Sequence, residues 1–259
     1  MLELTGSTAL VTGASSGIGA EFAAALARRG SDLILVARRE DRLRALAERL
    51  AAEHGVGARV IAADLADPAD LQALIAEVRD LPIDVLVNNA GFATHGAFAE
   101  QKPQRIHDEI AVNVLALVAL TRTLLPGMIQ RDRGAVVNVA STAAFQPISH
   151  MAVYGATKAF VLSFTEALWG ETEGSGVDVV ALCPGATDTE FFDVAGEAAS
   201  VGGRQSPEQV VATAIRELDR RRTAPSVVSG AANRWSSRLP RVLPRRTTIR
   251  VTRNLVAPK

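Results

Sequence analysis

The sequence predicts a doubly wound α/β fold, in which helices cover both faces of a parallel sheet. Stretches with the composition of strands alternate with helical stretches along most of the 259 residues. The strand stretches are continuous apolar runs, as expected for parallel strands that are buried on both faces. The first of them, residues 9–11, leads through a glycine-rich turn directly into an amphipathic helix.

The other elements follow in chain order. The first helix ends at Arg28, Arg29 and Gly30, because cations and then a glycine suit a helix C-terminus. Asp67 and Pro68 have the order of an N-cap and a first helical residue, so a helix begins there. The further strands are expected at residues 33–37, 59–62, 83–87, 135–139, 177–182 and 226–229, and the further helices at residues 39–54, 103–130, 151–173 and 206–221.

The predicted helix 103–130 has the most apolar centre of the chain. Residues 110–120 are apolar apart from Asn113, so we expect this helix to be buried on most sides and Asn113 to have hydrogen-bond partners. No contiguous apolar run approaches the roughly 18 residues that a membrane-spanning helix needs.

Composition limits the classes of protein. The 28 basic and 28 acidic residues balance, so overall charge does not indicate a nucleic-acid partner. The single cysteine, Cys183, excludes an internal disulfide and suits a reducing compartment, and the N-terminus has no signal-peptide pattern. We therefore expect a cytoplasmic protein whose residues 1–230 form one domain. The spacing of the histidines does not indicate a metal site.

The glycine-rich turn is the strongest candidate for a ligand site. Its spacing, G-x-x-x-G-x-G, differs from the common dinucleotide fingerprint, and no Walker lysine follows it, which argues against a nucleotide triphosphatase. The free N–H groups and the dipole of a helix N-terminus favour an anion, so we expect a nucleotide pyrophosphate here. The alternative is a tight strand–helix turn without a ligand. The expected contacts are Gly13, Ser15, Ser16, Gly17, Ile18 and Gly19.

Arg38 follows the second strand, where dinucleotide folds that prefer NAD carry an acidic residue. A guanidinium there binds a 2′-phosphate in a fork, so the sequence favours NADP(H) over NAD(H). The alternative is that Arg38 and Arg39 only begin the solvated face of the next helix. A similar choice holds for Asn89, Ala90 and Gly91 after the fourth strand, which suit either turn chemistry or ligand contact at the sheet edge.

Tyr154, the only tyrosine, lies four residues before Lys158, so both side chains share one face of the predicted helix. Moving a phenol pKa from near 10 to about 7 takes about 4 kcal/mol, which a lysine ammonium and a nicotinamide cation can supply together. Ser141, just after the fifth strand, is placed to hold a substrate oxygen. Each residue alone also has an ordinary structural explanation, but their order behind a nucleotide turn favours catalysis.

Together, the motifs at residues 12–19, 88–91, 113, 141, 154–158 and 184–189 resemble the classical short-chain dehydrogenase/reductase family, over about residues 5–229. The resemblance implies a Rossmann sheet of seven parallel strands and a nicotinamide cofactor. It also implies a catalytic tetrad of Asn113, Ser141, Tyr154 and Lys158. In that tetrad the tyrosine is general acid or base, the serine orients the carbonyl, the lysine holds the ribose and lowers the tyrosine pKa, and the asparagine supports a water.

The resemblance further implies cofactor contacts and self-association. Asp64 lies by the adenine, Asn89 and Ala90 by the ribose, and Thr189 by the carboxamide, while Arg38 departs from the family's frequent acidic residue in the direction of NADP. It also implies a homo-dimer or homo-tetramer formed through helices 103–130 and 151–173. Beyond the glycine turn, the expected cofactor contacts are Arg38, Asp64, Leu65, Asn89, Ala90, Gly91, Tyr154, Lys158, Pro184, Gly185, Thr187 and Thr189.

The function expected from these features is NADP(H)-dependent transfer of hydride between nicotinamide and a largely apolar ketone or secondary alcohol. The alternative is a non-catalytic nucleotide-sensing protein on the same fold, which would have no need of Tyr154 and Lys158. His150 adjoins the expected substrate region. The predicted apolar wall of that region is Phe92, Phe98, Phe145, Pro147, Ile148, Met151, Phe191 and Phe192, although half of these residues can equally pack the loops.

Residues 231–259 are expected to form a basic C-terminal extension. From residue 234 on there are seven arginines and one lysine without an acidic residue, which leaves 20 basic against 28 acidic residues elsewhere, a net charge of −8. Arg234, Arg238, Arg241 and Arg245 would share one helical face, but Pro240 and Pro244 would break such a helix. Three alternatives stand: peripheral contact with an anionic membrane, docking on the acidic body of its own or a neighbouring subunit, or a solvated tail.

Overall fold

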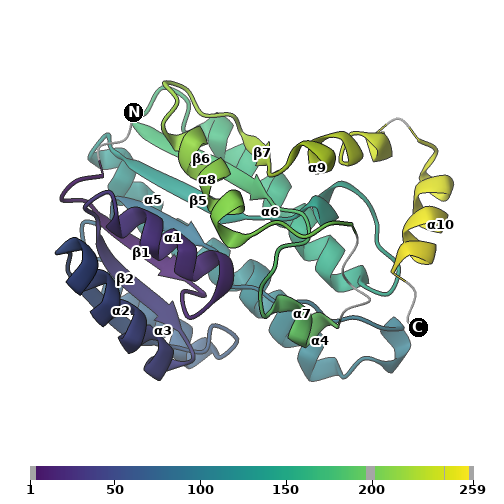
Figure 1. Ribbon diagram of the computed structural model, residues 1–259, viewed down its shortest axis with the longest axis horizontal. Helices are drawn as coiled ribbons and strands as arrows, with labels where there is room; N and C mark the ends of the chain where they lie inside the picture. Colours follow the sequence, from purple (N-terminus) through teal and green to yellow (C-terminus); the bar gives the residue numbers. More distant parts are fainter. Residues whose placement is uncertain (1–3, 197–201, 242, 257–259) are drawn as a thin grey trace.

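The computed structural model describes residues 4–196, 202–241 and 243–256, and its centre is a parallel seven-stranded sheet (Figure 1). The strand order β3-β2-β1-β4-β5-β6-β7 reverses direction between β1 and β4, which creates a crevice at the carboxyl ends of the strands. The predicted Rossmann fold is therefore confirmed. The strands are β1 (Thr8–Thr12), β2 (Asp32–Ala37), β3 (Ala58–Ala62), β4 (Val85–Asn88), β5 (Gly134–Val139), β6 (Val177–Cys183) and β7 (Ser226–Val228).

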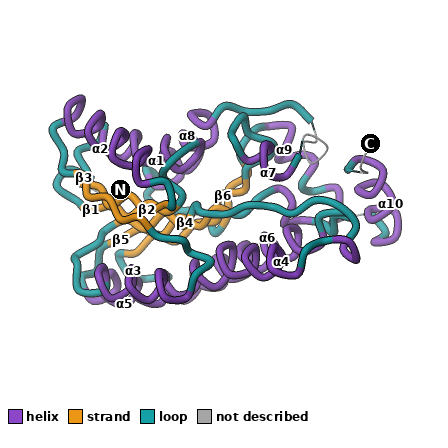
Figure 2. Tube along the Cα trace, turned by 90° about the horizontal axis from the view of Figure 1, so that it is seen from below, coloured by secondary structure: helices purple, strands orange, loops and turns teal. Residues whose placement is uncertain are grey.

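Helices cover both faces of the sheet (Figure 2). One face packs against α1 (Gly17–Ala27), α2 (Glu40–His54) and α8 (Pro207–Leu218), and the other against α3 (Pro68–Val78), α5 (Leu117–Gln130) and α6 (Ala152–Glu171). Every residue of β4 and β5 is buried, which explains why the central strands are continuous apolar runs. Because both layers are closely packed, the strand ends and the loops that follow them are held in fixed positions.

The helix expected at residues 103–130 forms as one continuous helical stretch. It consists of α4 (Pro103–Ile110), a π-helical segment (Ala111–Ala116) and α5, so its middle departs from α-helical hydrogen bonding around Asn113. Burial of its centre, residues 110–120, is partial, because Ile110 and Leu115 are 40% and 56% exposed while the other residues are buried or half-buried. Asn113 itself is buried and its side chain is hydrogen-bonded, as predicted.

By length and composition alone, residues 103–130 would be able to cross a membrane, with a mean hydropathy of 1.7 in the best window. About half of that window, 44%, is buried inside the protein. The stretch packs along the sheet as a core helix does, and core helices pass the same test.

The β6–α8 connection contains a short helix, α7 (Phe191–Ala195), where the sequence predicts a loop. Two 3₁₀ turns, Phe98–Glu100 and Thr142–Phe145, lie in the connections after β4 and β5. All three short elements lie beyond the carboxyl ends of the strands. They build up the side of the molecule on which the crevice opens.

The C-terminal extension folds back onto its own chain. It forms α9 (Ala231–Ser236), a 3₁₀ turn (Leu239–Arg241) and α10 (Arg245–Leu255), with breaks at Pro240 and Pro244 as predicted. The four arginines therefore share no single helical face. Thr252 Oγ1 donates to the Pro147 carbonyl at 2.9 Å, and His95 Nε2 lies 2.8 Å from the Val256 carbonyl oxygen. Docking on its own subunit is thus the alternative that the structure supports, and a freely solvated tail is wrong.

Candidate active site

A cavity of about 630 Å³ lies at the carboxyl ends of the strands. Its lining includes the glycine turn after β1, the residues that follow β2, β4, β5 and β6, the start of α6, and parts of the C-terminal extension. Every residue that the sequence predicts as catalytic or cofactor-binding lines this cavity except Gly19 and Asn113. Gly19 and Asn113 lie behind its wall, as described below.

The glycine turn is a cradle that side chains would fill. Gly17 has a φ of +54°, and a Cβ there would lie 2.8 Å from Thr189 Cγ2. A Cβ on Gly19 would collide with the carbonyl of Gly13. Ser16, the N-cap of α1, makes no side-chain cap, so the first N–H groups of the helix are not satisfied by it. Uncapped N–H donors beside a cavity fit the phosphate groups of a dinucleotide.

Asn89 joins the end of β4 to the end of β1. Its Nδ2 donates to the Thr12 carbonyl at 2.9 Å, and Thr12 Oγ1 accepts from the N–H groups of Asn89 and Ala90, both at 3.0 Å. The side-chain amide nitrogen of Asn89 thus has a structural role. Asn89, Ala90 and Gly91 nonetheless line the cavity, so contact of this segment with a ligand stays a prediction.

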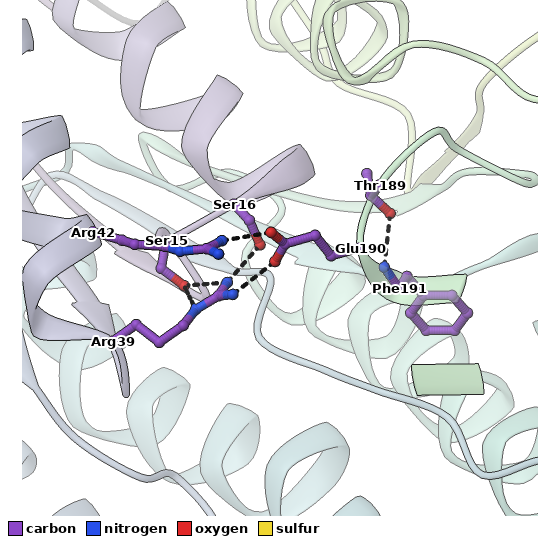
Figure 3. A network of polar contacts seen from close by, with 7 residues as sticks. All are labelled: Ser15, Ser16, Arg39, Arg42, Thr189, Glu190 and Phe191. Atoms are coloured by element: carbon purple, nitrogen blue, oxygen red, sulfur yellow. Dashed lines mark hydrogen bonds and ion pairs between the residues drawn. The ribbon is translucent and has the colours of Figure 1, made fainter. Parts of the chain in front are cut away.

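Two arginines after β2 take different positions at the cavity. The Arg38 side chain is 71% exposed, and its Nη1 lies 4.0 Å from Asp64 Oδ2. Arg39 points back across the turn, where it donates to Ser15 Oγ and Ser16 Oγ and pairs with Glu190 at 2.8 Å (Figure 3). Sequence reasoning assigned Arg38 to the cofactor and overlooked Arg39, which has the same charge and lies one residue later.

Glu190 connects this side of the cavity to the segment after β6. Its two carboxylate oxygens accept from Arg39 and Arg42 (Figure 3), and these hydrogen bonds, that of Arg42 first, lower the pKa of Glu190 to about 2. The next residue, Phe191, lines the same cavity, and its N–H donates to Thr189 Oγ1. The ion pairs therefore bind α2 to the segment that carries Phe191.

Leu65 and the residues after β6 complete the predicted cofactor contacts. Pro184 accepts a hydrogen bond from the Thr142 N–H at 2.8 Å, which ties the segment after β6 to that after β5. Thr187 is buried and donates to the Gly185 carbonyl. A Cβ on Gly185 would collide with the Asn233 side chain of α9, so a larger residue here would require that side chain to move.

Tyr154, Ser141 and Lys158 meet at the cavity, as the sequence predicts. All three are nearly or fully buried. Ser141 caps the 3₁₀ turn after β5 and hydrogen-bonds the Tyr154 side chain. The Lys158 ammonium donates to the Val139 carbonyl at 2.8 Å and lies 5.9 Å from the centre of the Tyr154 ring.

Burial dominates the electrostatics of this group in the protein alone. Burial raises the pKa of Tyr154 to about 12, although its hydrogen bond to Ser141 opposes this shift. Burial also lowers the pKa of Lys158 to about 8. In the protein alone, burial thus outweighs the opposing hydrogen bond, and Tyr154 is a protonated phenol at neutral pH.

Asn113 supports the site from behind. Its Nδ2 donates to the Phe92 carbonyl and to Thr157 Oγ1, while its Oδ1 accepts from the Phe92 N–H. A Cβ on Gly91 would lie 2.9 Å from Asn113 Oδ1 and 3.3 Å from Lys158 Nζ. Asn113, Gly91 and Lys158 are therefore close neighbours, as the predicted tetrad requires.

Glu109 is a buried carboxylate that sequence reasoning missed. It lies one helical turn before Asn113, and its Oε2 accepts from the N–H and hydroxyl groups of Thr94. Among the described residues its Oε1 has no hydrogen-bond partner, and burial raises its pKa although the hydrogen bonds from Thr94 and then the charges of Lys158 and Arg105 oppose this. The i, i+4 spacing to Asn113 was the only signal in the sequence.

Five of the eight residues predicted for the apolar wall line the cavity. Phe98 is instead exposed on its 3₁₀ turn, Phe145 packs against the core beside α6, and the Pro147 carbonyl accepts from Thr252. His150 also stays outside and uses its carbonyl for the Gly96 N–H. The five that line the cavity are Phe92, Ile148, Met151, Phe191 and Phe192.

Comparison with known proteins identifies the family. The family model described as short chain dehydrogenase matches residues 7–199. A ketoacyl reductase, HetN, from Nostoc sp. is 34% identical over 229 residues, which cover 86% of this chain and 79% of that protein.

Two solved structures are similar over most of the chain. A short-chain dehydrogenase from Sphingobium yanoikuyae in complex with NADPH has a TM-score of 0.82 and 42% identity, and the match covers 89% of this chain and 91% of that one. A bulky-bulky ketone specific alcohol dehydrogenase from Comamonas testosteroni has a TM-score of 0.78 and 35% identity, with 89% of each chain covered. The fold, the grouping of Ser141, Tyr154 and Lys158, and these matches agree that the chain belongs to the short-chain dehydrogenase family of oxidoreductases.

Proposed function

We propose that the protein is a cytoplasmic, NADP(H)-dependent oxidoreductase that interconverts a largely apolar ketone and the corresponding secondary alcohol. One observation carries this proposal. The same cavity contains an anion cradle, a buried Ser141–Tyr154–Lys158 group and an apolar wall. A dinucleotide, a proton donor and an apolar carbonyl compound can thus be bound side by side.

The donors around the cradle support the choice of cofactor. The uncapped start of α1 fits the pyrophosphate, and the guanidinium groups of Arg38 and Arg39 at the cavity fit a 2′-phosphate. Two solved relatives carry NADPH by their titles, the Sphingobium enzyme and an L-sorbose reductase from Gluconobacter frateurii. When bound, the nicotinamide supplies or accepts the hydride.

The residues of the chain supply binding and the proton. Ser141 holds the carbonyl oxygen by a hydrogen bond, and Tyr154 donates its phenolic proton to that oxygen as the alcohol forms. The Lys158 ammonium stabilises the tyrosinate left behind. Asn113 positions the segment that starts at Phe92 and thereby the floor of the site.

The pKa of Tyr154 favours ketone reduction at neutral pH. A phenol whose pKa is raised to about 12 is protonated and ready to donate. Alcohol oxidation requires the ionised phenol, and that form becomes more populated as the pH rises. We therefore assign reduction as the direction that the buried site favours under neutral conditions.

The lining supports an apolar substrate. Phe191, Phe192 and Met151 present ring and thioether surface that a charged substrate would not match. The Nostoc relative is named as a ketoacyl reductase and the Comamonas relative as specific for bulky-bulky ketones. Both names describe substrates that carry a ketone group.

Self-association is part of the proposal. Ile110 and Leu115 on the α4–α5 stretch and Phe160 on α6 are exposed apolar side chains on the two helices expected to pair. We expect a homo-dimer or homo-tetramer by light scattering. Leu115→Glu is expected to shift the mass toward the monomer, and a wild type that is monomeric at high concentration would contradict the assignment.

A ketone panel monitored by NADPH absorbance tests the function. Wild type is expected to reduce bulky apolar ketones, and Tyr154→Phe is expected to lower kcat by about 10²–10⁴-fold, which is the usual contribution of a general acid. The affinity for NADPH should stay unchanged in the variant. Tight NADPH binding without turnover of any ketone would instead favour a nucleotide-sensing protein.

A further inference from the structure

The C-terminal extension holds an unusual share of the exposed apolar side chains. Among the described residues, eleven large apolar side chains are exposed, and six of them lie in the extension: Trp235, Leu239, Leu243, Ile249, Val251 and Leu255. Four of the six, Leu239, Leu243, Val251 and Leu255, line the cavity. Exposed apolar groups gathered around a cavity indicate a ligand-binding surface rather than a solvated tail.

Charge is sorted between the two sides of α10. Thr248, Val251 and Leu255 follow the i, i+3, i+7 pattern of one helical face, and all three line the cavity. Arg250 and Arg253 are exposed and do not line it. Although the extension is rich in arginine, the part of it that lines the cavity contributes no charged side chain among the described residues.

The extension is fixed to three different segments of the site. His95, after β4, contacts the Val256 carbonyl, and Pro147, after β5, accepts from Thr252. Asn233 lies against Gly185, after β6, without room for a Cβ between them. Because these segments also carry site residues, α10 stands in a defined position relative to the cavity.

We propose that α10, together with Leu239 and Leu243, is the outer wall of the substrate subsite, and that Val251 and Leu255 determine which ketones fit. The proposal rests on the proposed function. Its substrate is a ketone with an uncharged, extended apolar group that reaches this wall, because a charged group there would find no partner on α10.

Filling the wall tests the proposal. Val251→Trp and Leu255→Trp are compared with Ile249→Trp, a matched control on the same helix whose exposed side chain lies outside the cavity. The readout is kcat/KM for a series of ketones with one constant methyl group and a growing apolar group. In the two wall variants, the kcat/KM of the largest ketone divided by that of the smallest is expected to fall by about tenfold. The change should lie mainly in KM, because apolar pockets discriminate substrates by size to about this extent.

Two further measurements separate the possible failures. Val251→Ala is expected to shift the preference toward larger ketones, and NADPH affinity should not change in any variant. If the wall and control variants show the same size preference, the proposal is wrong while the proposed function stands. If wild type reduces no ketone, the proposed function is wrong, and binding of the neutral apolar dye Nile red then tests the wall by itself. Weaker dye binding only in the wall variants supports the wall. Equal dye binding in all variants overturns it.

Discussion

The cavity has two walls that are built in different ways. On the cofactor side, the lining consists of a glycine turn and strand-end residues such as Asn89 and Ala90, held by the register of β1, β2 and β4. On the substrate side, it consists of apolar side chains from α7, from the start of α6 and from α10. The first wall is mostly backbone and small residues, whereas the second is mostly large side chains.

This difference separates what is fixed from what can vary. A wall of backbone atoms positions phosphate groups only if the turn keeps its shape, so most substitutions there should damage binding. A wall of side chains changes its shape with each substitution and so sets the range of substrates. Tyr154 stands where the two walls meet, in contact with Phe191 at 5.5 Å between ring centres.

The largest expected effect is on the cofactor wall, at Gly17. In Gly17→Val, the positive φ and the approach of Thr189 would strain the turn by about 1–3 kcal/mol, or about 5- to 150-fold in the NADPH Kd. Gly170→Ala, on α6 with open space around it, is the matched control and should leave the Kd unchanged. Equal affinities in the two variants would mean that the turn does not form the phosphate site.

The arginines provide the next test of this wall. Arg38→Ala is expected to raise the NADPH Kd about tenfold and to leave the NADH Kd unchanged, because a charged hydrogen bond contributes about 1.5–3 kcal/mol. Arg39→Ala should weaken both cofactors, since Arg39 also holds Ser15, Ser16 and Glu190. Fluorescence titration measures the six dissociation constants of wild type and the two variants, and a wild type without preference for NADPH would refute the phosphate role.

Where the two walls meet, the pH dependence of ketone reduction tests the roles of Lys158 and Tyr154. Lys158, with a pKa lowered to about 8, keeps its positive charge below that pH and loses it above, while Tyr154 stays protonated throughout. Ketone reduction should therefore be level up to about pH 8 and then fall by about tenfold per unit, as for a single ionising group. In Lys158→Arg this fall should move to higher pH. A fall at the same pH in that variant would assign it to another group.

The smallest effect concerns the outer face of α10. A peripheral membrane contact stays a prediction, and each exposed arginine would add about 1 kcal/mol on an anionic surface, or about fivefold in partitioning. Arg250→Ser should reduce sedimentation with phosphatidylserine vesicles by that factor, whereas Arg49→Ser on α2 should not. Identical sedimentation of both variants would contradict a membrane contact through α10.

Short-range sequence patterns predicted the cofactor wall better than the substrate wall. The glycine turn, Ser141 and the Tyr154–Lys158 pair were predictable because strand ends meet at one sheet edge and i, i+4 residues share a helical face. The docking of α10 depends on contacts across more than a hundred residues, such as Thr252 with Pro147, and no short-range pattern encodes them.

The sequence also could not predict features that differ by one residue or one helical turn. Arg38 and Arg39 are identical in type, and only the position of Glu190 in the folded chain draws Arg39 across the turn. The π segment around Asn113 packs against α6, and hydrophobic periodicity does not report such contacts between distant elements. Burial of Tyr154 raises its pKa for the same reason, because the surroundings of a side chain follow from tertiary structure.

Glu190 connects the cofactor side of the cavity to its substrate side. Its carboxylate is held by Arg39 and Arg42, and the ring of its neighbour in the chain, Phe191, packs at a tilt against the Tyr154 ring. An anion that competes for Arg39 must loosen Glu190 and so shift an aromatic ring one peptide bond away. Any such competition would make the affinities for nucleotide and ketone interdependent, and thermodynamic reciprocity requires that each ligand alter the other's affinity by the same factor.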